Sequence, residues 1–171
     1  MIGRALLALL VPAALAAQGP PGPARPLDPN GTWITMGLGA ATPGFAGQVA
    51  ITHHWGIHGV TARGMLSSNI HLFTDEVEKF ADAGLMYGIH VRAHGAFLTL
   101  RAGPGVFWYE SDHLIANDYY RSGARLGMPF EAGMSGVLGG NFGIGLSAIG
   151  NLNSVKSIFG LMLTLSMGEL E

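Results

Sequence analysis

The segment FGLMLTLSMG, residues 159–168, decides how the rest of the chain is interpreted. Its odd-numbered positions are all apolar, whereas its even-numbered positions are mostly glycine, threonine or serine. Successive side chains of a β-strand point to opposite faces of the sheet. The segment therefore predicts a strand with one continuous apolar face and one face of small or polar side chains.

The same alternation recurs seven times upstream of this segment. The predicted strands cover residues 32–41, 45–55, 59–67, 85–94, 96–108, 125–138 and 142–149. The connections at 56–59, 94–95 and 139–140 are tight, whereas those at 69–84 and 109–124 are long and lie at the opposite end. Short turns at one end and longer loops at the other are typical of transmembrane barrels. The pattern predicts an all-β fold, an eight-stranded antiparallel up-and-down transmembrane β-barrel.

Composition separates this fold from a soluble barrel of the lipocalin type. Only 12% of the 171 residues are charged, about half the share of an average soluble domain. A soluble barrel needs charged side chains along its outer face, but the polar faces here carry glycine, serine, threonine and isolated arginine or histidine. Such faces suit the narrow interior of an eight-stranded barrel. The net charge of −2 argues against a nucleic-acid partner, and the absence of cysteine excludes disulfides and cysteine-bound metals.

The N-terminus predicts export. Arg4 precedes an apolar run at 5–11, and small residues follow at 14–17, which is typical of a cleaved secretory signal peptide. We therefore expect a signal peptide at 1–17, a proline-rich linker at 18–30 and the barrel at 31–171. The expected location is the outer membrane.

These features together resemble the small eight-stranded outer-membrane barrels of Gram-negative bacteria, the group of the outer membrane protein A barrel domain and outer membrane protein X. The resemblance covers about residues 30–168. The last hairpin, 143–161, also resembles the ending of uncharacterised small outer-membrane proteins, which assigns no activity. Many such barrels end in an aromatic residue, whereas this chain ends in Glu171. The resemblance implies a monomer surrounded by outer-membrane lipid.

The barrel interior is predicted to hold a polar network. Buried charges must be paired or hydrated, so the preferred interpretation is a rigid polar plug, and the alternative is a small porin-like pore or ligand site with a cationic wall. Gln48 and His54 are expected beside this network. Its expected members are Arg63, His90, Arg92, Arg101, Arg125 and Glu131.

The two long loops are the expected contact surface for extracellular or envelope ligands, because loops on a rigid scaffold often carry binding. The predicted contact residues in the second loop are Tyr109, Asp112, Tyr119 and Tyr120. In the first loop, Asp75 and Glu78 resemble a helix-capping pair. Val77 and Phe80 would then form the apolar side of a short helix.

Histidines raise the question of a metal site. His53, His54, His58 and His94 fall near two tight turns on one rim, where imidazoles could bind zinc or copper. Adjacent residues of a strand face opposite sides, so His53 and His54 cannot both belong to one site. We therefore expect no metal and no cofactor.

The alternative function is that of a lipid A-modifying enzyme, a deacylase or acyltransferase, which some barrels of this size are. A deacylase would need serine, histidine and an acid near the outer rim, and a change in lipid A mass would distinguish it from a structural protein. We expect no catalysis. The candidates for such a site are Ser67, Ser68, His71, and Glu110 or Asp112.

Overall fold

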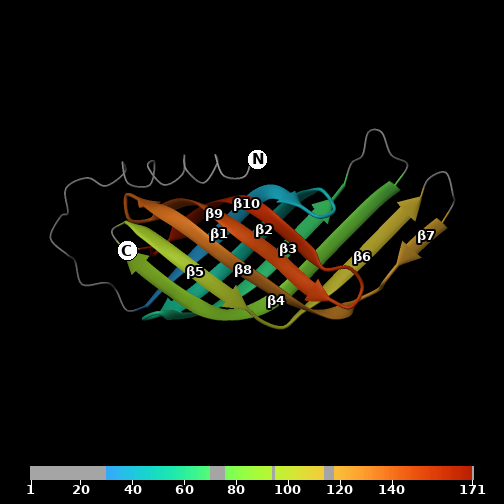
Figure 1. The fold of residues 1–171 in the computed structure, drawn as a ribbon. Coiled ribbons are helices and arrows are strands. Elements are labelled where there is room, and N and C mark those ends of the chain that lie inside the picture. Colours follow the sequence, from blue (N-terminus) through green and yellow to red (C-terminus); the bar gives the residue numbers. More distant parts are fainter. Residues whose placement is uncertain (1–29, 70–75, 94, 114–117, 171) are drawn as a thin grey trace, which may run out of the picture.

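The chain forms one antiparallel β-sheet that closes on itself. The computed structural model describes residues 30–69, 76–93, 95–113 and 118–170, so the predicted signal peptide and nearly all of the linker lie outside the described residues. The strands are β1 (Asn30–Ala41), β2 (Phe45–Trp55), β3 (His58–Ser68), β4 (Glu76–Ala93), β5 (Ala96–Ala102), β6 (Gly105–His113), β7 (Asp118–Arg121), β8 (Arg125–Leu138), β9 (Phe142–Asn153) and β10 (Ile158–Gly168) (Figure 1).

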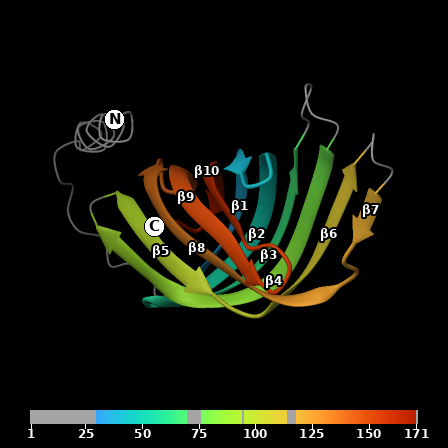
Figure 2. The same ribbon diagram turned by 45° about the vertical axis from the view of Figure 1, so that its right-hand side comes forward.

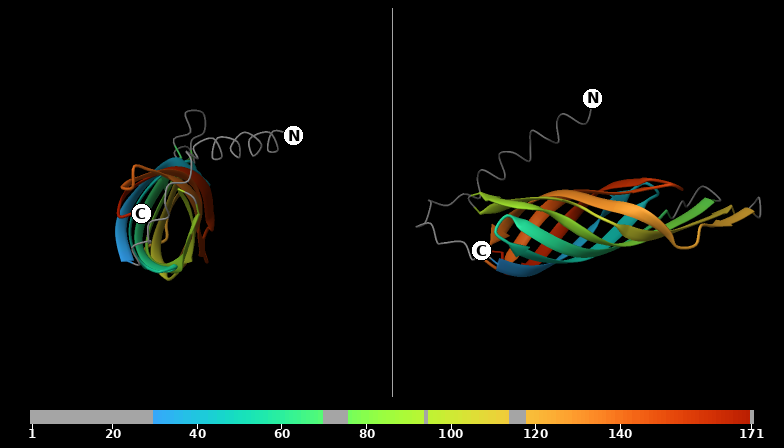
Figure 3. Two further views of the ribbon diagram at one scale, coloured as in Figure 1. Left: turned by 90° about the vertical axis from the view of Figure 1, so that its left-hand side faces the viewer. Right: turned by 90° about the horizontal axis from the view of Figure 1, so that it is seen from below.

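Two pairings complete the ring. β1 pairs with β10 from Trp33 opposite Gly168 to Ala41 opposite Gly160, and β3 pairs with β4 along its whole length. β5 and β6 both pair with β4, so together they occupy one strand position, or stave, of the barrel. β7 and β8 both pair with β6 and together form another stave. The ten strands therefore make eight staves, and the view along the axis shows a closed ring (Figure 3). The predicted fold class is confirmed.

The apolar row of each strand faces outward. In β10, Leu161 and Leu163 are 68% and 61% exposed, whereas Met162 and Thr164 between them are buried. The same alternation runs through β1, where Trp33, Thr35 and Gly37 are buried between exposed neighbours. A soluble barrel would place the apolar rows inside, so the lipocalin-like alternative is wrong.

Two prolines explain why one predicted strand is divided. The segment predicted at 96–108 is split into β5 and β6 at Gly103 and Pro104. Gly103 N–H donates to the Pro129 carbonyl (3.1 Å), and Leu85 N–H donates to the Pro104 carbonyl (3.0 Å). Proline has no N–H, so Pro129 and Pro104 cannot donate the reciprocal hydrogen bonds to the carbonyls of Gly103 and Leu85. The ladder is interrupted there, but the strand register continues on both sides.

The structure corrects the predicted loop at 69–84. Residues 76–84 continue β4, and the short helix expected from Glu78, Val77 and Phe80 does not form, while Asp75 lies outside the described residues. Phe80 faces the lumen and stacks on Phe107, with ring centroids 5.8 Å apart. Ladder hydrogen bonds on both sides and this aromatic contact outweigh a local helix signal.

The second predicted loop, 109–124, is also largely strand. β6 continues to His113, and β7 returns beside it with Asp112 opposite Tyr119. β4, β6 and β7 therefore form a three-stranded sheet that extends beyond the other strands (Figures 1 and 2). We call this sheet, residues 76–80, 109–113 and 118–121, the projecting sheet.

The opposite end of the barrel has the tight turns. Gly56 and Gly139 adopt φ angles of 57° and 65°, in the left-handed region that glycine enters without steric penalty.

Within the described residues, no helix is long and apolar enough to cross a membrane.

A charge placed in the outward row tests whether that row meets lipid. Leu163→Arg, at the centre of β10, should lower the free energy of unfolding in lipid vesicles by ~2–4 kcal/mol, because the guanidinium would enter the hydrocarbon. Urea titration followed by tryptophan fluorescence measures this change. Leu138→Arg, near a tight turn, is the matched control and should cost ~0–1 kcal/mol. Equal losses at both positions would contradict a membrane-spanning wall.

Candidate functional site

The lumen holds two buried ion pairs, and the first joins β3 to β4. Arg63 Nη2 lies 2.9 Å from Asp82 Oδ2, and both side chains are fully shielded from solvent. Arg63 also donates to the carbonyls of Phe130 (3.2 Å) and Gly150 (3.3 Å). Asn151 Nδ2 donates to the same carboxylate oxygen of Asp82 (3.0 Å). The guanidinium thus connects opposite sides of the ring.

The second ion pair joins β5 to β8. Arg101 Nη2 lies 2.8 Å from Glu131 Oε2, and the two residues face each other directly in the strand register. Arg101 Nη1 donates to the hydroxyls of Thr52 (2.8 Å) and Thr61 (2.9 Å) on β2 and β3. Ser147 on β9 donates to the other carboxylate oxygen of Glu131 (2.9 Å).

These networks link strands that are not neighbours. Removing two charges from water is costly, and their attraction compensates only when further hydrogen bonds satisfy both groups. Here each carboxylate and each guanidinium has at least one such bond, whereas Asp82 Oδ1 and the Nε atoms of Arg63 and Arg101 have no hydrogen-bond partner among the described residues. Gly88 makes room for one network, because a Cβ there would lie 2.5 Å from Cβ of Arg101. The arrangement favours a rigid interior, in which polar contacts join strands on opposite sides of the ring.

The other predicted network members have different positions. His90 is buried and meets Trp33 edge-on, with ring centroids 5.1 Å apart. Arg92 lies on β4 opposite Phe97 in the register. Arg125 is exposed and donates from Nε to the Ser122 carbonyl (3.3 Å), so it does not join the buried network and its predicted lumen position is wrong. Arg125 is the first residue of β8 and pairs with Phe107 of β6, whereas the pairing of β8 with β9 begins only at Gly127.

Sequence reasoning missed Asp82, the acid that pairs with Arg63. Asp82 lies in the segment predicted as a loop, because the small side chains of Ala81 and Ala83 are too weakly apolar to indicate that the strand begins before Leu85. The alternation nevertheless continues there, with Phe80, Asp82 and Met86 all buried. An unpaired arginine in the predicted lumen was the signal that could have directed attention to a nearby acid.

Apolar side chains fill the lumen on both sides of the ion pairs. Towards the tight-turn end, Trp33, Phe97 and Leu170 form one buried cluster. Towards the projecting sheet, a larger cluster contains Ala46, Met65, Phe80, Phe107, Tyr109, Ile149, Ile158 and Met162. The buried charges therefore lie between two apolar layers.

A polar contact crosses the mouth next to the projecting sheet. Lys156, in the turn between β9 and β10, makes an ion pair with Glu78 on β4, and Tyr109 on β6 donates a hydrogen bond to the same carboxylate. Asn153 shapes the turn, because its Oδ1 accepts the N–H of Val155 (3.0 Å) and of Lys156 (2.8 Å). Burial acts to lower the pKa of Lys156, but its hydrogen bond to Glu78 and the charge of that carboxylate raise it overall.

The predicted loop-contact residues lie on strands rather than in loops. Tyr109 is buried and takes part in the contact across the mouth, which removes it from the outer surface. Asp112 lies opposite Tyr119 at the end of the projecting sheet. Tyr119 and Tyr120 are exposed, and the ring of Tyr120 lies 6.2 Å from that of Tyr109.

The histidines near the tight turns have separate partners. His53 Nδ1 shares a hydrogen bond with the Thr32 hydroxyl (2.9 Å), and His58 Nδ1 shares one with the Tyr87 hydroxyl (2.7 Å). His94 lies outside the described residues. Among the residues that are described, no three histidine, aspartate or glutamate side chains are grouped to hold a metal ion.

The residues considered for catalysis that the structure describes are buried or have other polar contacts. Ser67 faces the lumen and is buried, and Ser68 donates to the Asn69 carbonyl (3.3 Å). Glu110 forms an ion pair with Arg121 (3.1 Å). His71 lies outside the described residues.

Solved structures with the same fold are outer-membrane barrels. Neisserial surface protein A matches with a TM-score of 0.56 and 12% identity over 83% of this chain and 96% of that one. The N-terminal barrel domain of OprF from Pseudomonas aeruginosa matches at 0.59 and 12%, over 81% and 96%. Ail, the attachment invasion locus protein of Yersinia pestis, matches at 0.54 and 12%, over 81% and 97%, in a complex with the heparin analogue sucrose octasulfate. No family model and no curated protein matches the chain. At these identities the likeness shows a shared fold.

The buried pair on β5 and β8 should contribute strongly to stability. Glu131→Gln leaves the Arg101 charge without its carboxylate in the lumen, so the free energy of unfolding should fall by ~3–5 kcal/mol. Glu110→Gln, which breaks an exposed pair, is the control and should cost less than ~1 kcal/mol. The measurement is urea unfolding in detergent micelles. A small loss at Glu131 would show that water enters the lumen and solvates Arg101.

Proposed function

We propose that this chain is an exported, monomeric outer-membrane protein that holds the projecting sheet at the cell surface, with a structural or surface-interaction role and no catalysis. The observation that carries this proposal is a barrel with an apolar outer wall and one end extended by β4, β6 and β7. Because the barrel strands pair in a closed ring, they need no second copy of the chain to satisfy their backbone groups.

The asymmetry of the two ends supports an orientation. Outer-membrane barrels have short periplasmic turns and longer extracellular segments. Here the short turns at Gly56, Gly95 and Gly139 lie at one end, and the projecting sheet lies at the other. We therefore place the projecting sheet outside the cell.

The surface of the projecting sheet is suited to contact. Tyr119 and Tyr120 are 58% and 46% exposed, and tyrosine is enriched at protein interfaces. The neighbouring Arg121 can offer hydrogen bonds from an exposed guanidinium. Ail was solved with a heparin analogue, which is consistent with extracellular ligand contact in a barrel of this fold.

The lumen is proposed to be closed. Its buried ion pairs lie between two apolar clusters, and the contact of Lys156 with Glu78 crosses the mouth. An eight-stranded barrel leaves room only for its own side chains. A continuous water path would have to pass both apolar layers.

Single-cysteine labelling tests the orientation, since the natural chain contains no cysteine. On intact cells, a membrane-impermeant maleimide should label Tyr119→Cys, because this side chain is exposed on the projecting sheet. Ile57→Cys, exposed at a tight turn, should react only after the outer membrane is permeabilised. Labelling of Ile57→Cys alone on intact cells would show that the barrel has the opposite orientation. Recovery of both variants in the soluble fraction would refute membrane insertion.

Electrical recording tests the closed lumen. The purified protein in planar lipid bilayers should give no steady current above that of the bare membrane, because no continuous water path crosses the apolar layers. A large porin in the same membranes is the positive control. Steady single-channel steps that disappear when the protein is heat-unfolded would contradict a closed lumen.

A further inference from the structure

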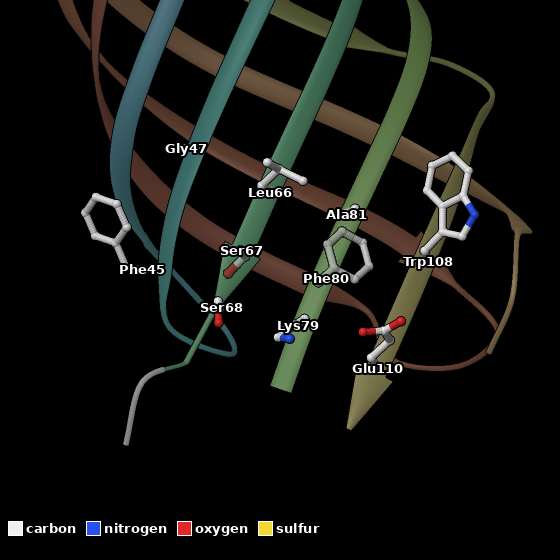
Figure 4. A pocket seen from close by; sticks show the side chains of 10 residues that line it. All are labelled: Phe45, Gly47, Leu66, Ser67, Ser68, Lys79, Phe80, Ala81, Trp108 and Glu110. Atoms are coloured by element: carbon white, nitrogen blue, oxygen red, sulfur yellow. The ribbon is translucent and has the colours of Figure 1, made fainter. Parts of the chain in front are cut away.

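The outer wall of the barrel carries a groove next to the projecting sheet. The groove has a volume of about 550 Å³, within the range of about 300–1,000 Å³ typical of small-molecule sites. It crosses β2, β3, β4 and β6 (Figure 4). Its lining is formed by Phe45, Gly47, Leu66, Ser67, Ser68, Lys79, Phe80, Ala81, Trp108 and Glu110.

The strand register explains why the wall is hollow there. Gly47, Leu66, Ala81 and Trp108 follow one another as directly paired residues across the four strands. Gly47 and Ala81 are small, whereas Leu66 and Trp108 stand on either side of Ala81 (Figure 4). The alternation of small and large side chains leaves a depression between ridges.

A charged row borders this apolar row on the side of the projecting sheet. Ser68, Lys79, Glu110 and Arg121 are paired in sequence across β3, β4, β6 and β7. Glu110 forms its ion pair with Arg121, and no ion pair of Lys79 is found among the described residues. The three ionised side chains carry a net charge of +1, with Lys79 directly at the groove (Figure 4).

The position of these rows sets the chemistry of an occupant. Charged side chains are costly in the hydrocarbon region, and tryptophan is enriched at the membrane interface. A row of charges directly beyond Trp108 therefore marks the level of lipid headgroups. An apolar groove that faces hydrocarbon below this level is filled by lipid, because a void would lose the contacts of its walls.

We propose that the groove binds one acyl chain of a membrane lipid whose phosphorylated headgroup carries a net negative charge, and that Lys79 contacts this headgroup. The proposal rests on membrane insertion, which is part of the proposed function. The apolar walls contact the acyl chain, and the ammonium of Lys79 attracts the negatively charged headgroup. A lysine near an anionic surface favours such lipids about fivefold.

The experiment uses the tryptophan that lines the groove. The chain has three tryptophans, so a Trp55→Phe background leaves Trp108 at the groove and Trp33, which is 5% exposed, in the lumen. The protein is placed in nanodiscs of phosphatidylcholine that contain a small fraction of brominated phosphatidylglycerol or, separately, brominated phosphatidylcholine. Bromine on the acyl chains quenches tryptophan on contact. Brominated phosphatidylglycerol should quench at about one fifth of the mole fraction that brominated phosphatidylcholine requires.

Two variants separate the roles of charge and groove. Lys79→Gln should abolish the preference for the anionic lipid while zwitterionic lipid still quenches. Gly47→Leu should reduce quenching by both lipids, because the added side chain enters the groove. A Cβ at this position meets only Leu38 Cδ2 at 3.4 Å and the Gly37 carbonyl at 3.8 Å, so the backbone does not need to move. Ala81→Leu fills the groove from β4 and gives a second, independent test.

Matched controls lie outside the groove. Arg125→Gln removes another exposed cation, and Gly136→Leu adds the same side chain to an exposed position, where the nearest atom to a new Cβ is the Ile144 carbonyl oxygen at 3.9 Å. Both should behave like the parent.

Equal quenching of the parent by the two lipids, or an equal loss of quenching in Gly136→Leu and Gly47→Leu, would overturn the lipid site. Heat-modifiable gel mobility reports insertion separately, so a parent that fails to insert refutes the proposed function as well, whereas an inserted parent without lipid preference refutes only this site.

Discussion

The structure depends on closing the hydrogen-bond ladder between β3 and β4. A sheet that spans lipid has no water with which to satisfy its backbone N–H and carbonyl groups, so an open edge would be very costly. The pairing from His58 opposite Ile89 to Ser68 opposite Lys79 removes that edge. Once the ring is closed, every strand must present one face to lipid and the other to a narrow lumen. The alternating sequence is the consequence of this constraint.

Closure also determines what the lumen can contain. Arginine side chains reach across the ring, so Arg63 meets carbonyls on β8 and β9, and Arg101 meets hydroxyls on β2 and β3. Each cation has a carboxylate within 3 Å. Glycine provides space at close approaches such as Gly88. The interior is therefore held by polar contacts between distant strands as well as by the ladder itself.

β4 connects the three parts of the molecule that bear on function. It provides Asp82 to the lumen, Glu78 to the contact across the mouth, and Lys79 to the outer groove. Alternation makes this possible, because Glu78 and Asp82 face inward while Lys79 between them faces outward. The 18 residues of β4 make it long enough to continue from the closed ring into the projecting sheet.

The sequence alone determined the alternation, the number of staves, the outward direction of the apolar rows and the end that carries the tight turns, because a strand repeats every two residues and glycine marks its turns. It indicated Arg101 and Glu131 as lumen residues. Only the tertiary structure decided that residues 76–84 and 109–113 extend strands, that Asp82 is the partner of Arg63, and that Arg125 lies outside the network. Those outcomes depend on register and on which strands become neighbours when the ring closes. Pairing between residues far apart in the chain leaves no trace in local periodicity, so the same alternation is compatible with several registers, and ring closure selects one.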